Sequence, residues 1–180
     1  MLRYKGYAWN GIFNIIISMI YTKLFFPQCR LIRLPFRLRL MGRFLGGSKL
    51  TVGIDNRIDI FKGAELFLGE NIQTNDHVHI ACASRVTIGS DTLIASRVYI
   101  SDHDHDFSNI SERPIDWPLK TKNVLIGSGC WIGEGVAILK GVNLGNGCVV
   151  GANSVVTKSF PAGSVIAGVP ARIIKYRKIL

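Results

Sequence analysis

Residues 126–156 read IGSGCWIGEGVAILKGVNLGNGCVVGANSVV, and an aliphatic side chain recurs there at every sixth position. An α-helix repeats near 3.6 residues and an ordinary strand near 2, so this period fits neither. It is typical of a parallel β-helix, in which each hexad forms one face and three hexads complete a coil. The aliphatic positions are Ile126, Ile132, Ile138, Leu144, Val150 and Val156, and glycine follows four of them, at Gly127, Gly133, Gly145 and Gly151.

The same period occurs earlier in three shorter runs, each shifted by two residues from the one before. A shift of two can be absorbed at a corner of the coil without turning the apolar column outward. We therefore expect the β-helix to include this part of the chain as well. The runs are Ile54, Ile60 and Leu66, then Leu68, Thr74, Ile80 and Val86, then Ile88, Ile94 and Ile100.

The period stops at Ile100 and resumes at Val124. The residues between, 101–123, are polar and include Pro114 and Pro118, which predicts a loop that leaves the β-helix. Long loops within compact domains are usually functional, so this loop is the first place to look for a site.

The chain of 180 residues has room for one repeat domain and an appendage. We divide it into an apolar and basic helical segment, 1–48, and a repeat domain, 49–180, that ends in a short tail. The net charge of +10 is uneven, because the first fifty residues contain nine Lys or Arg and no acidic residue. A second basic group, which suits an anionic ligand or is merely solvated, comprises Arg172, Lys175, Arg177 and Lys178.

The four cysteines do not form a disulfide pattern. Cys130 and Cys148 are eighteen residues apart, which predicts that both point inward in one column, as small apolar fillers. No C-x-x-C motif occurs, which argues against a thiolate zinc site. A reducing compartment, the cytoplasm, fits this pattern.

Residues 7–26 are mostly apolar, with a polar stripe at Asn10, Asn14, Ser18 and Thr22 that predicts an amphipathic helix. The stripe argues against a membrane-spanning helix, and no A-x-A-like site suggests a cleaved signal peptide. Two interpretations stay open. The apolar side enters the inner face of the cytoplasmic membrane while the following arginines meet anionic lipid, or the helix packs on protein. The basic residues form no recognised nucleic-acid motif.

The loop opens with Ser-Asp-His-Asp-His-Asp over residues 101–106. A histidine held by a carboxylate is the usual general base near neutral pH, and at an interrupted coil it could take a proton from a hydroxyl. His103 and His105 are therefore the candidate catalytic residues. The alternative is a solvated polar loop without a catalytic role.

Three motifs in this order identify a resemblance: residues 123–133 (NVLIGSGCWIG), 150–158 (VGANSVVTK) and 167–172 (AGVPAR). Over about residues 50–176 the chain resembles the hexapeptide-repeat O-acetyltransferases, which include galactoside, maltose and xenobiotic acetyltransferases, and most of all those of bacterial polysaccharide and O-antigen clusters. The resemblance implies an all-β, left-handed parallel β-helix, a homotrimer with sites between adjacent subunits, and direct transfer from acetyl-CoA to a sugar hydroxyl of a surface-polysaccharide precursor, which can be lipid-linked.

The resemblance also assigns residues on the acceptor side. In galactoside-type members the catalytic histidine lies five residues after the last aliphatic of the coil, which here is His105 counted from Ile100. The same count places a substrate-contacting asparagine at Asn75. Asp102 and Asp104 are expected beside the acceptor. Because histidine occurs twice, His103 remains the alternative base.

On the donor side, the resemblance assigns small or flat residues to the pantetheine arm and basic residues to the nucleotide phosphates. Basic groups there have a physical reason, since CoA is strongly anionic. Small residues let a long thin ligand lie against the coil. The pantetheine set is Trp131, Gly133, Glu134, Gly151, Ala152 and Thr157, and the phosphate set is Lys158, Arg172 and Lys175.

Two other functions compete. His77 and His79 are two residues apart and would share one face of a strand. With a third histidine they could bind zinc, as in a trimeric β-helix enzyme resembling γ-class carbonic anhydrase. No histidine follows His105, so we expect no metal. The second competitor is a non-catalytic β-helix scaffold.

Overall fold

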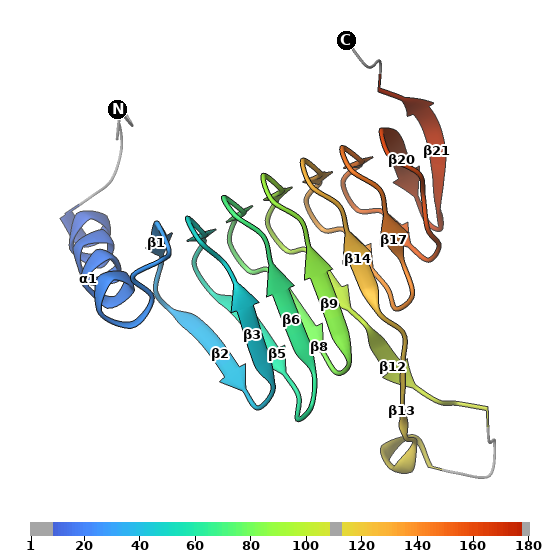
Figure 1. Cartoon of the computed structure of the whole chain (residues 1–180), viewed down its shortest axis with the longest axis horizontal. Coiled ribbons are helices and arrows are strands. Elements are labelled where there is room, and N and C mark those ends of the chain that lie inside the picture. Colours follow the sequence, from blue (N-terminus) through green and yellow to red (C-terminus); the bar gives the residue numbers. More distant parts are fainter. Residues whose placement is uncertain (1–8, 109–112, 178–180) are drawn as a thin grey trace.

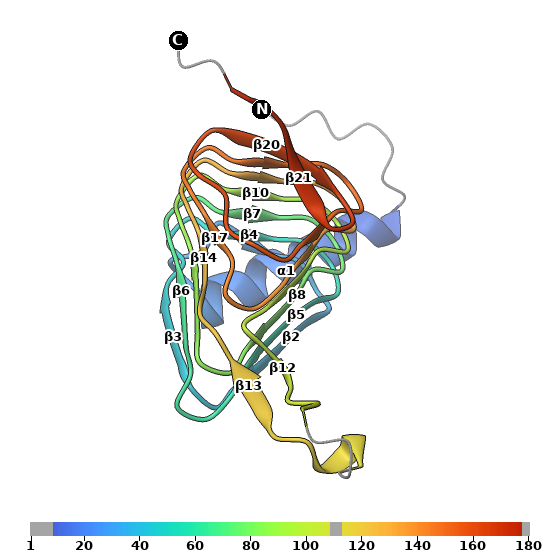
Figure 2. The same ribbon diagram turned by 90° about the vertical axis from the view of Figure 1, so that its right-hand side faces the viewer.

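Three parallel sheets run the length of the molecule, and one helix lies across its N-terminal end (Figure 1). The structure is a computed structural model that describes residues 9–108 and 113–177. Figure 2 is a view down the solenoid axis and shows the three sheets enclosing one narrow core. The chain therefore forms the parallel β-helix that the six-residue period predicts.

Each coil contributes one strand to each sheet, in the order A, B, C. We call the turn after a sheet A strand the A–B corner and the turn after a sheet B strand the B–C corner. Sheet A consists of β1 (Leu31–Ile32), β4 (Thr51–Val52), β7 (Gln73–Thr74), β10 (Leu93–Ile94), β15 (Trp131–Ile132), β18 (Val149–Val150), β20 (Ser164–Gly168) and the antiparallel β21 (Ala171–Tyr176). Sheet B consists of β2 (Phe36–Leu40), β5 (Asn56–Ile60), β8 (His79–Cys82), β11 (Tyr99–Ser101), β16 (Ala137–Ile138) and β19 (Val155–Val156). Sheet C consists of β3 (Arg43–Gly46), β6 (Glu65–Leu68), β9 (Arg85–Ile88), β14 (Val124–Ile126) and β17 (Asn143–Leu144).

The predicted aliphatic columns form the core. Ile132 pairs with Val150 in sheet A, and Ile138 pairs with Val156 in sheet B, all buried. Cys130 and Cys148 also point inward, one coil apart, and all four cysteines of the chain are buried free thiols. One inward position was misassigned: Ile54 is half-buried at the A–B corner, because Val52 takes the buried place and pairs with Thr74.

The β-helix begins earlier than residue 49. Strand β2 pairs in parallel with β5, and β3 pairs with β6, so residues 31–46 already form a coil. The expected helical segment 1–48 is therefore wrong for these residues. Their alternation of arginine and aliphatic residues is the two-residue period of strands, with arginines outward.

The basic residues of this first coil meet acidic residues of the second coil and, at Asp76, of the third. Because stacking places residue i beside a residue about twenty positions later, an acid-free stretch can lie against an acid-containing one. The ion pairs are Arg33–Asp76 at 3.4 Å, Arg37–Asp55 at 4.0 Å, Arg39–Asp59 at 3.8 Å, Arg43–Glu65 at 2.8 Å, and Lys49–Glu70.

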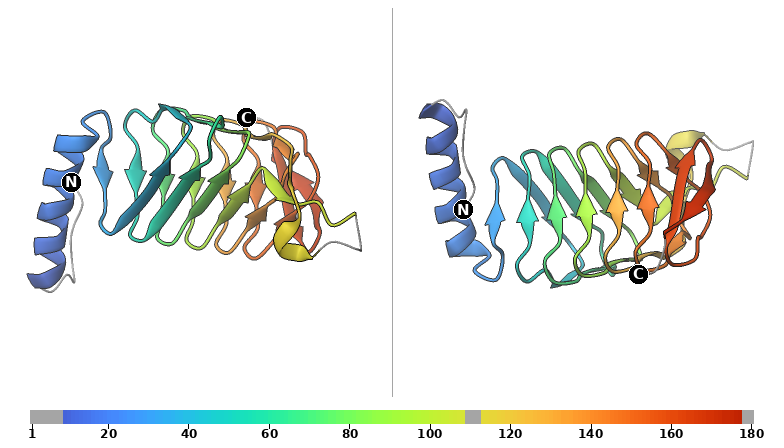
Figure 3. Two further views of the ribbon diagram at one scale, coloured as in Figure 1. Left: turned by 90° about the horizontal axis from the view of Figure 1, so that it is seen from below. Right: turned by 90° about the horizontal axis from the view of Figure 1, so that it is seen from above.

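Helix α1 (Trp9–Phe25) turns Ser18 and Thr22 of its polar stripe toward the β-helix, whereas Asn14 is exposed. Ser18 and Thr22 are buried, and their side-chain oxygens accept hydrogen bonds from the backbone N–H groups of Leu34 (3.0 Å) and Ile32 (2.8 Å). The helix thus covers the open edge of the first coil, roughly perpendicular to the solenoid axis (Figure 3). No helix in the described part of the chain is long and apolar enough to cross a membrane.

The predicted loop is an arm that leaves the solenoid at a B–C corner (Figures 1 and 2). It contains an antiparallel ribbon of β12 (His103–His105) and β13 (Leu119–Thr121), and the short 3-10 helix η1 (Pro114–Asp116). Residues 109–112 lie outside the described residues. Both candidate histidines therefore lie where the arm starts.

Candidate active site

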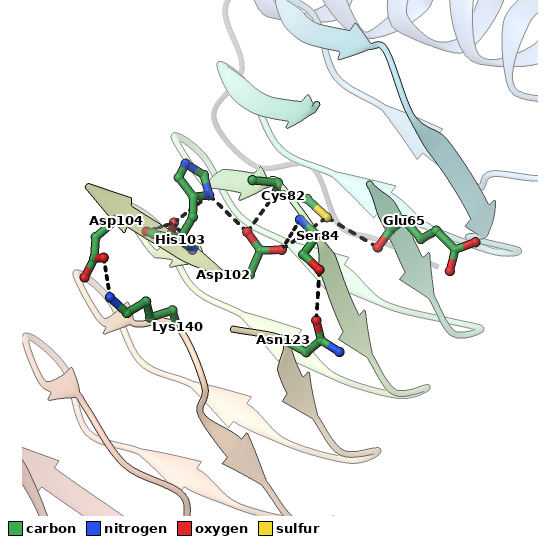
Figure 4. A network of polar contacts seen from close by, with 10 residues as sticks. Glu65, Cys82, Ser84, Asp102, His103, Asp104, Asn123 and Lys140 are labelled. Carbon is green, nitrogen blue, oxygen red and sulfur yellow. Dashed lines mark hydrogen bonds and ion pairs between the residues drawn. The ribbon is translucent and has the colours of Figure 1, made fainter. Parts of the chain in front are cut away.

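Asp102 is the buried anchor of the arm. It follows β11 directly, and its carboxylate accepts hydrogen bonds from the backbone N–H groups of Ala83 (2.8 Å) and Ser84 (2.7 Å) in the coil below. The same carboxylate lies 3.0 Å from Nδ1 of His103 (Figure 4). The backbone of the neighbouring coil thus fixes a carboxylate, and the carboxylate fixes an imidazole.

His103 has the environment of a general base. A carboxylate can only accept a hydrogen bond, so in the neutral imidazole Nδ1 carries the hydrogen and Nε2 keeps its lone pair. The Phe61 ring packs edge-on against the imidazole, with 5.3 Å between ring centroids, and the Ser101 hydroxyl lies 3.3 Å from Nδ1. The side chain is 12% exposed, so the imidazole is not fully enclosed by the described residues.

His105 is placed differently. Its side chain is exposed, and Nδ1 donates to the backbone carbonyl of Trp117, 3.0 Å away, across the arm. Asp104 pairs instead with Lys140 of the next coil (Figure 4), and Asp106 accepts from the N–H of Ser108. Of the two candidate histidines, only His103 has a carboxylate partner among the described residues.

Cys82 lies beside Asp102, with 3.8 Å between its Sγ and Oδ2 of the carboxylate. Burial and the neighbouring negative charge raise the pKa of the Cys82 thiol to about 12. A thiol that stays protonated is a poor nucleophile. This cysteine is therefore unsuited to carry an acyl group.

Several expected donor-side residues share the A–B corner. Gly133 and Gly151 stack there in consecutive coils: a Cβ on Gly133 would lie 2.6 Å from the carbonyl oxygen of Val150 and 2.8 Å from the nitrogen of Ala152. Only glycine fits this approach. Glu134 and Ala152, the next residue in each coil, are exposed, and Glu134 pairs with Arg97. Trp131 projects from the outer face of sheet A and is half exposed.

The remaining donor-side residues lie in two places, on β21 of sheet A and at the B–C corner after β19. Arg172 and Lys175 are exposed on β21 at the C-terminal end of sheet A, where they pair in register with Ala167 and Val165. Thr157 and Lys158 follow β19, at the B–C corner above His103. Lys158 lies over the Phe160 ring, 5.6 Å from Nζ to the centroid. Among the described residues, none of these cations forms an ion pair.

Asn75 and His103 are not neighbours within one chain. Asn75 follows β7 at the A–B corner and is exposed, whereas His103 lies at the B–C corner. Sheet B separates the two corners. The structure thus assembles Asp102, His103 and Asp104 at one edge, and Asn75, Gly133, Glu134, Gly151 and Ala152 along the other.

The expected histidine pair does not share a face. His77 lies in the A–B corner with φ +59°, ahead of β8, while His79 bonds Oδ2 of Asp59 at 3.1 Å. Because His77 is in a turn, the alternation of a strand does not apply to it. Within the described ranges, no group of three His, Cys, Asp or Glu side chains is arranged to hold a metal ion.

Phe61 and Lys140 were not among the expected site residues. The coil period could have indicated Lys140, because it lies two positions after Ile138, as Asp102 does after Ile100 in the paired strand. Phe61 carries the same signal from two coils below, because it lies three positions after Ile58, as His103 does after Ile100, and both isoleucines pair with Ile80.

A family model, individual relatives and solved structures all relate this chain to hexapeptide-repeat acetyltransferases. The family model of the bacterial transferase hexapeptide, with six repeats, matches residues 123–158. WbbJ of Escherichia coli K12, a protein assigned to O-acetyl transfer in lipopolysaccharide biosynthesis, is 44% identical over 179 residues, which cover 95% of this chain and 91% of the relative. The chain belongs to the hexapeptide-repeat acetyltransferase family. Its members transfer acetyl groups from acetyl-CoA, and their left-handed parallel β-helix confirms the predicted fold class.

Solved structures of this acetyltransferase family align over the β-helix. An acetyltransferase from Vibrio cholerae in complex with acetyl-CoA is 29% identical, with a TM-score of 0.67 over 76% of this chain and 72% of the other. Galactoside acetyltransferase in complex with CoA is 30% identical, with a TM-score of 0.64 over 74% and 64%. Both relatives bind the donor or its product, which supports the same ligand class for this acetyltransferase.

Proposed function

We propose that the protein transfers an acetyl group from acetyl-CoA to a sugar hydroxyl of a lipopolysaccharide or related surface-polysaccharide precursor, with His103 as general base. The observation that carries the proposal is the Asp102–His103 pair, 3.0 Å apart, at the root of the arm. The similarity to WbbJ over nearly the whole chain supports the acceptor class. The four free thiols fit a cytoplasmic reaction.

In this mechanism His103 takes the hydroxyl proton at Nε2 while the hydroxyl oxygen attacks the thioester carbonyl carbon. Asp102 holds the Nδ1 hydrogen and stabilises the imidazolium that forms. When the carbon–sulfur bond breaks, His103 returns the proton to the leaving CoA sulfur. Direct transfer is supported by the position of Cys82, the nearest thiol, whose raised pKa disfavours a covalent acyl intermediate.

The first test compares the two histidines. His103→Ala should lower kcat by roughly 10²–10⁴-fold, the usual share of general-base catalysis, while the Kd for acetyl-CoA stays unchanged. His105→Ala is the matched control, since it removes the same group two residues away. Loss of turnover in His105→Ala with turnover retained in His103→Ala would move the base to His105, as the family spacing predicts.

Asp102→Asn tests positioning. An amide can donate to Nδ1 and so favour the tautomer that lacks a lone pair on Nε2. We expect kcat to fall, KM for acetyl-CoA to hold, and the pH–rate profile to change its acid limb. A merely structural role would instead lower Tm and leave that profile unaltered.

We propose a homotrimer, because the acceptor residues of one chain lie at opposite edges of sheet B. Parallel packing of copies would bring Asn75 of one copy to His103 of the next. Mixed assemblies of Asn75→Ala and His103→Ala chains should then recover activity that neither variant has alone, because one site of the mixture is intact. A monomer by light scattering, or no recovery on mixing, would contradict the shared site.

We also propose that transfer needs no metal, which the scattered positions of the histidines support. Acetyl transfer should continue at full rate after exhaustive chelation. Loss of activity that zinc restores would instead favour a site at His77 and His79.

The acceptor is tested separately. A panel of nucleotide sugars and lipid-linked glycans, assayed with acetyl-CoA, identifies the acceptor.

A further inference from the structure

Helix α1 has an outward face of large apolar side chains, which we call the cap face. Its members are between 40% and 70% exposed, in a chain whose other large aliphatic residues mostly line the core. A contiguous apolar surface of this kind usually marks an interaction site. The cap face consists of Ile12, Phe13, Ile16, Ile17, Met19, Ile20, Leu24 and Phe25.

The helix cannot turn this face inward without losing hydrogen bonds. Ser18 and Thr22 accept the N–H groups of Leu34 and Ile32, which belong to the open edge of the first coil. Rotating the helix would bury apolar side chains against unpaired backbone donors, at a cost of the order of 1–3 kcal/mol for each donor. The orientation of the cap face is therefore fixed by the backbone that α1 covers.

We propose that the cap face lies in the interfacial region of a lipid bilayer and docks the enzyme with its solenoid axis upright on the membrane. A helix of 17 residues is about 26 Å long, and because it runs across the solenoid end, its whole length can meet a plane (Figure 3). Amphipathic helices bind such surfaces with the apolar side at the boundary between headgroups and acyl chains.

Charge favours a bilayer over a second copy of the chain. Helix α1 contains no acidic residue and carries Lys23 in its last turn, and the first acidic residue of the sequence is Asp55. Two cap faces brought together would bring two basic, acid-free regions together with no acidic group to neutralise them, whereas the cytoplasmic leaflet is anionic. The occupant that suits both the apolar side chains and the charge is therefore lipid.

The attachment rests on the apolar side chains more than the sequence suggested. The arginines after the helix were expected to meet lipid, but Arg33, Arg37, Arg39 and Arg43 each pair with an acidic residue of the second or third coil. Their charge is partly neutralised within the protein. Membrane binding should thus weaken with salt but persist, unlike binding by a purely basic patch.

Docking on this face deepens the proposed function, on which the following step rests. Strand β11, which leads to His103, is the fourth strand of sheet B from the capped end. With about 4.8 Å between strands, the base stands roughly 15 Å above the first coil, which the helix covers. A sugar linked through phosphate to a lipid could reach that height, so the acceptor would be lipid-linked rather than free.

The test is co-sedimentation of the full chain with phosphatidylglycerol–phosphatidylcholine vesicles, at low and high salt. Deleting residues 1–48 is unsuitable, because it removes a whole coil. Phe13→Glu and Leu24→Glu, at side chains 63% and 70% exposed, should each weaken vesicle binding about tenfold or more while Tm is unchanged. Ile174→Glu is the matched control: it is 65% exposed at the other end of the solenoid and should bind like the unmodified chain.

Equal pelleting of Phe13→Glu and Ile174→Glu, or no pelleting at any salt concentration, would overturn the proposal. So would an oligomer that dissociates in Phe13→Glu while vesicles are never bound, because a second copy would then cover the cap face. Pelleting that vanishes completely at high salt would assign the attachment to basic residues instead. Turnover of a soluble acceptor is measured in parallel, so failure to dock is distinguishable from failure of catalysis.

Discussion

The coils before the arm and the coils after it share one kind of core and differ on their outer surface. Between residues 31 and 88, cations of one coil meet acids of the next, as in Arg43–Glu65 and Glu65–Arg85. No acidic residue follows Glu134 in the sequence, so cations such as Arg172 and Lys175 have no acid in their own part of the chain. In the coils before the arm, opposite charges pair and so stabilise the stacking of neighbouring coils. In the coils after the arm, the cations lack such partners and are available to bind an anionic ligand.

The largest effect expected from this comparison is on donor affinity. Replacing Arg172 and Lys175 together by alanine should raise the Kd for CoA about 100-fold or more, because each charge-assisted hydrogen bond is worth about 1.5–3 kcal/mol. The control variant, Arg37→Ala with Arg43→Ala, removes two cations from the paired surface and should leave that Kd unchanged. Titration calorimetry at low salt measures both. Similar losses in the two double variants would break the comparison.

The second prediction concerns the corners. Gly133→Ala should lower the free energy of unfolding by about 3 kcal/mol, because the new Cβ meets backbone atoms at 2.6 and 2.8 Å. Gly63→Ala, in the other half, places its Cβ in open space at φ +79° and should cost only about 1 kcal/mol for the left-handed backbone. Urea unfolding of both variants decides it; equal costs would mean that the donor-side corner is not tightly stacked.

The third prediction tests paired charge where it is most buried. Although burial raises the pKa of Asp59, hydrogen bonds from Arg57 and His79 outweigh it and lower that pKa below its usual value. Asp59→Asn should reduce the free energy of unfolding by about 2 kcal/mol at pH 7, less than for a fully buried pair because the partners are partly exposed.

The sign of the pH dependence follows from the lowered pKa. The stability that Asp59 contributes is present above the pKa of the unfolded chain and is lost as pH falls through the lower pKa of the folded state, that is, below about pH 4. Thermal melts of the unmodified chain and Asp59→Asn should therefore converge as the solution is acidified. A difference in Tm that stays constant down to pH 2 would contradict the carboxylate's role.

The smallest expected effect is in the irregular half of the core. Oγ1 of Thr74 is buried without a hydrogen-bond partner among the described residues, in a column otherwise occupied by Val52 and Ile94. Thr74→Val should raise stability by about 1 kcal/mol. Thr92 is the control, since its hydroxyl donates to the carbonyl of Gly127 at 3.2 Å, so Thr92→Val should lower stability by a similar amount. A loss in both variants would show that Thr74 is satisfied.

Much of the solenoid was predictable because its signal is local and repeated. The hexads from Ile126 to Val156 fix the direction of each side chain, and the interruption at Ile100 locates the arm. The first coil escaped prediction, because residues 31–46 are a single turn and a period needs repetition to be recognised. The sequence predicts which segment contains the site, but not which of its two histidines has the carboxylate partner. In D-H-D-H each histidine has aspartate neighbours, and only the fold shows that His103 contacts the buried Asp102.

By itself the sequence determined the period-six core, the position of the arm and the family, since these depend on the local spacing and order of residues along the chain. The tertiary structure decided which partner each polar group has. Stacking put Ala83 and Ser84 under Asp102 and so oriented His103. It set the first coil's arginines against acids some twenty to forty residues later. It also turned Ser18 and Thr22 of α1 toward the protein, because their side-chain oxygens accept backbone N–H groups that a bilayer could not satisfy.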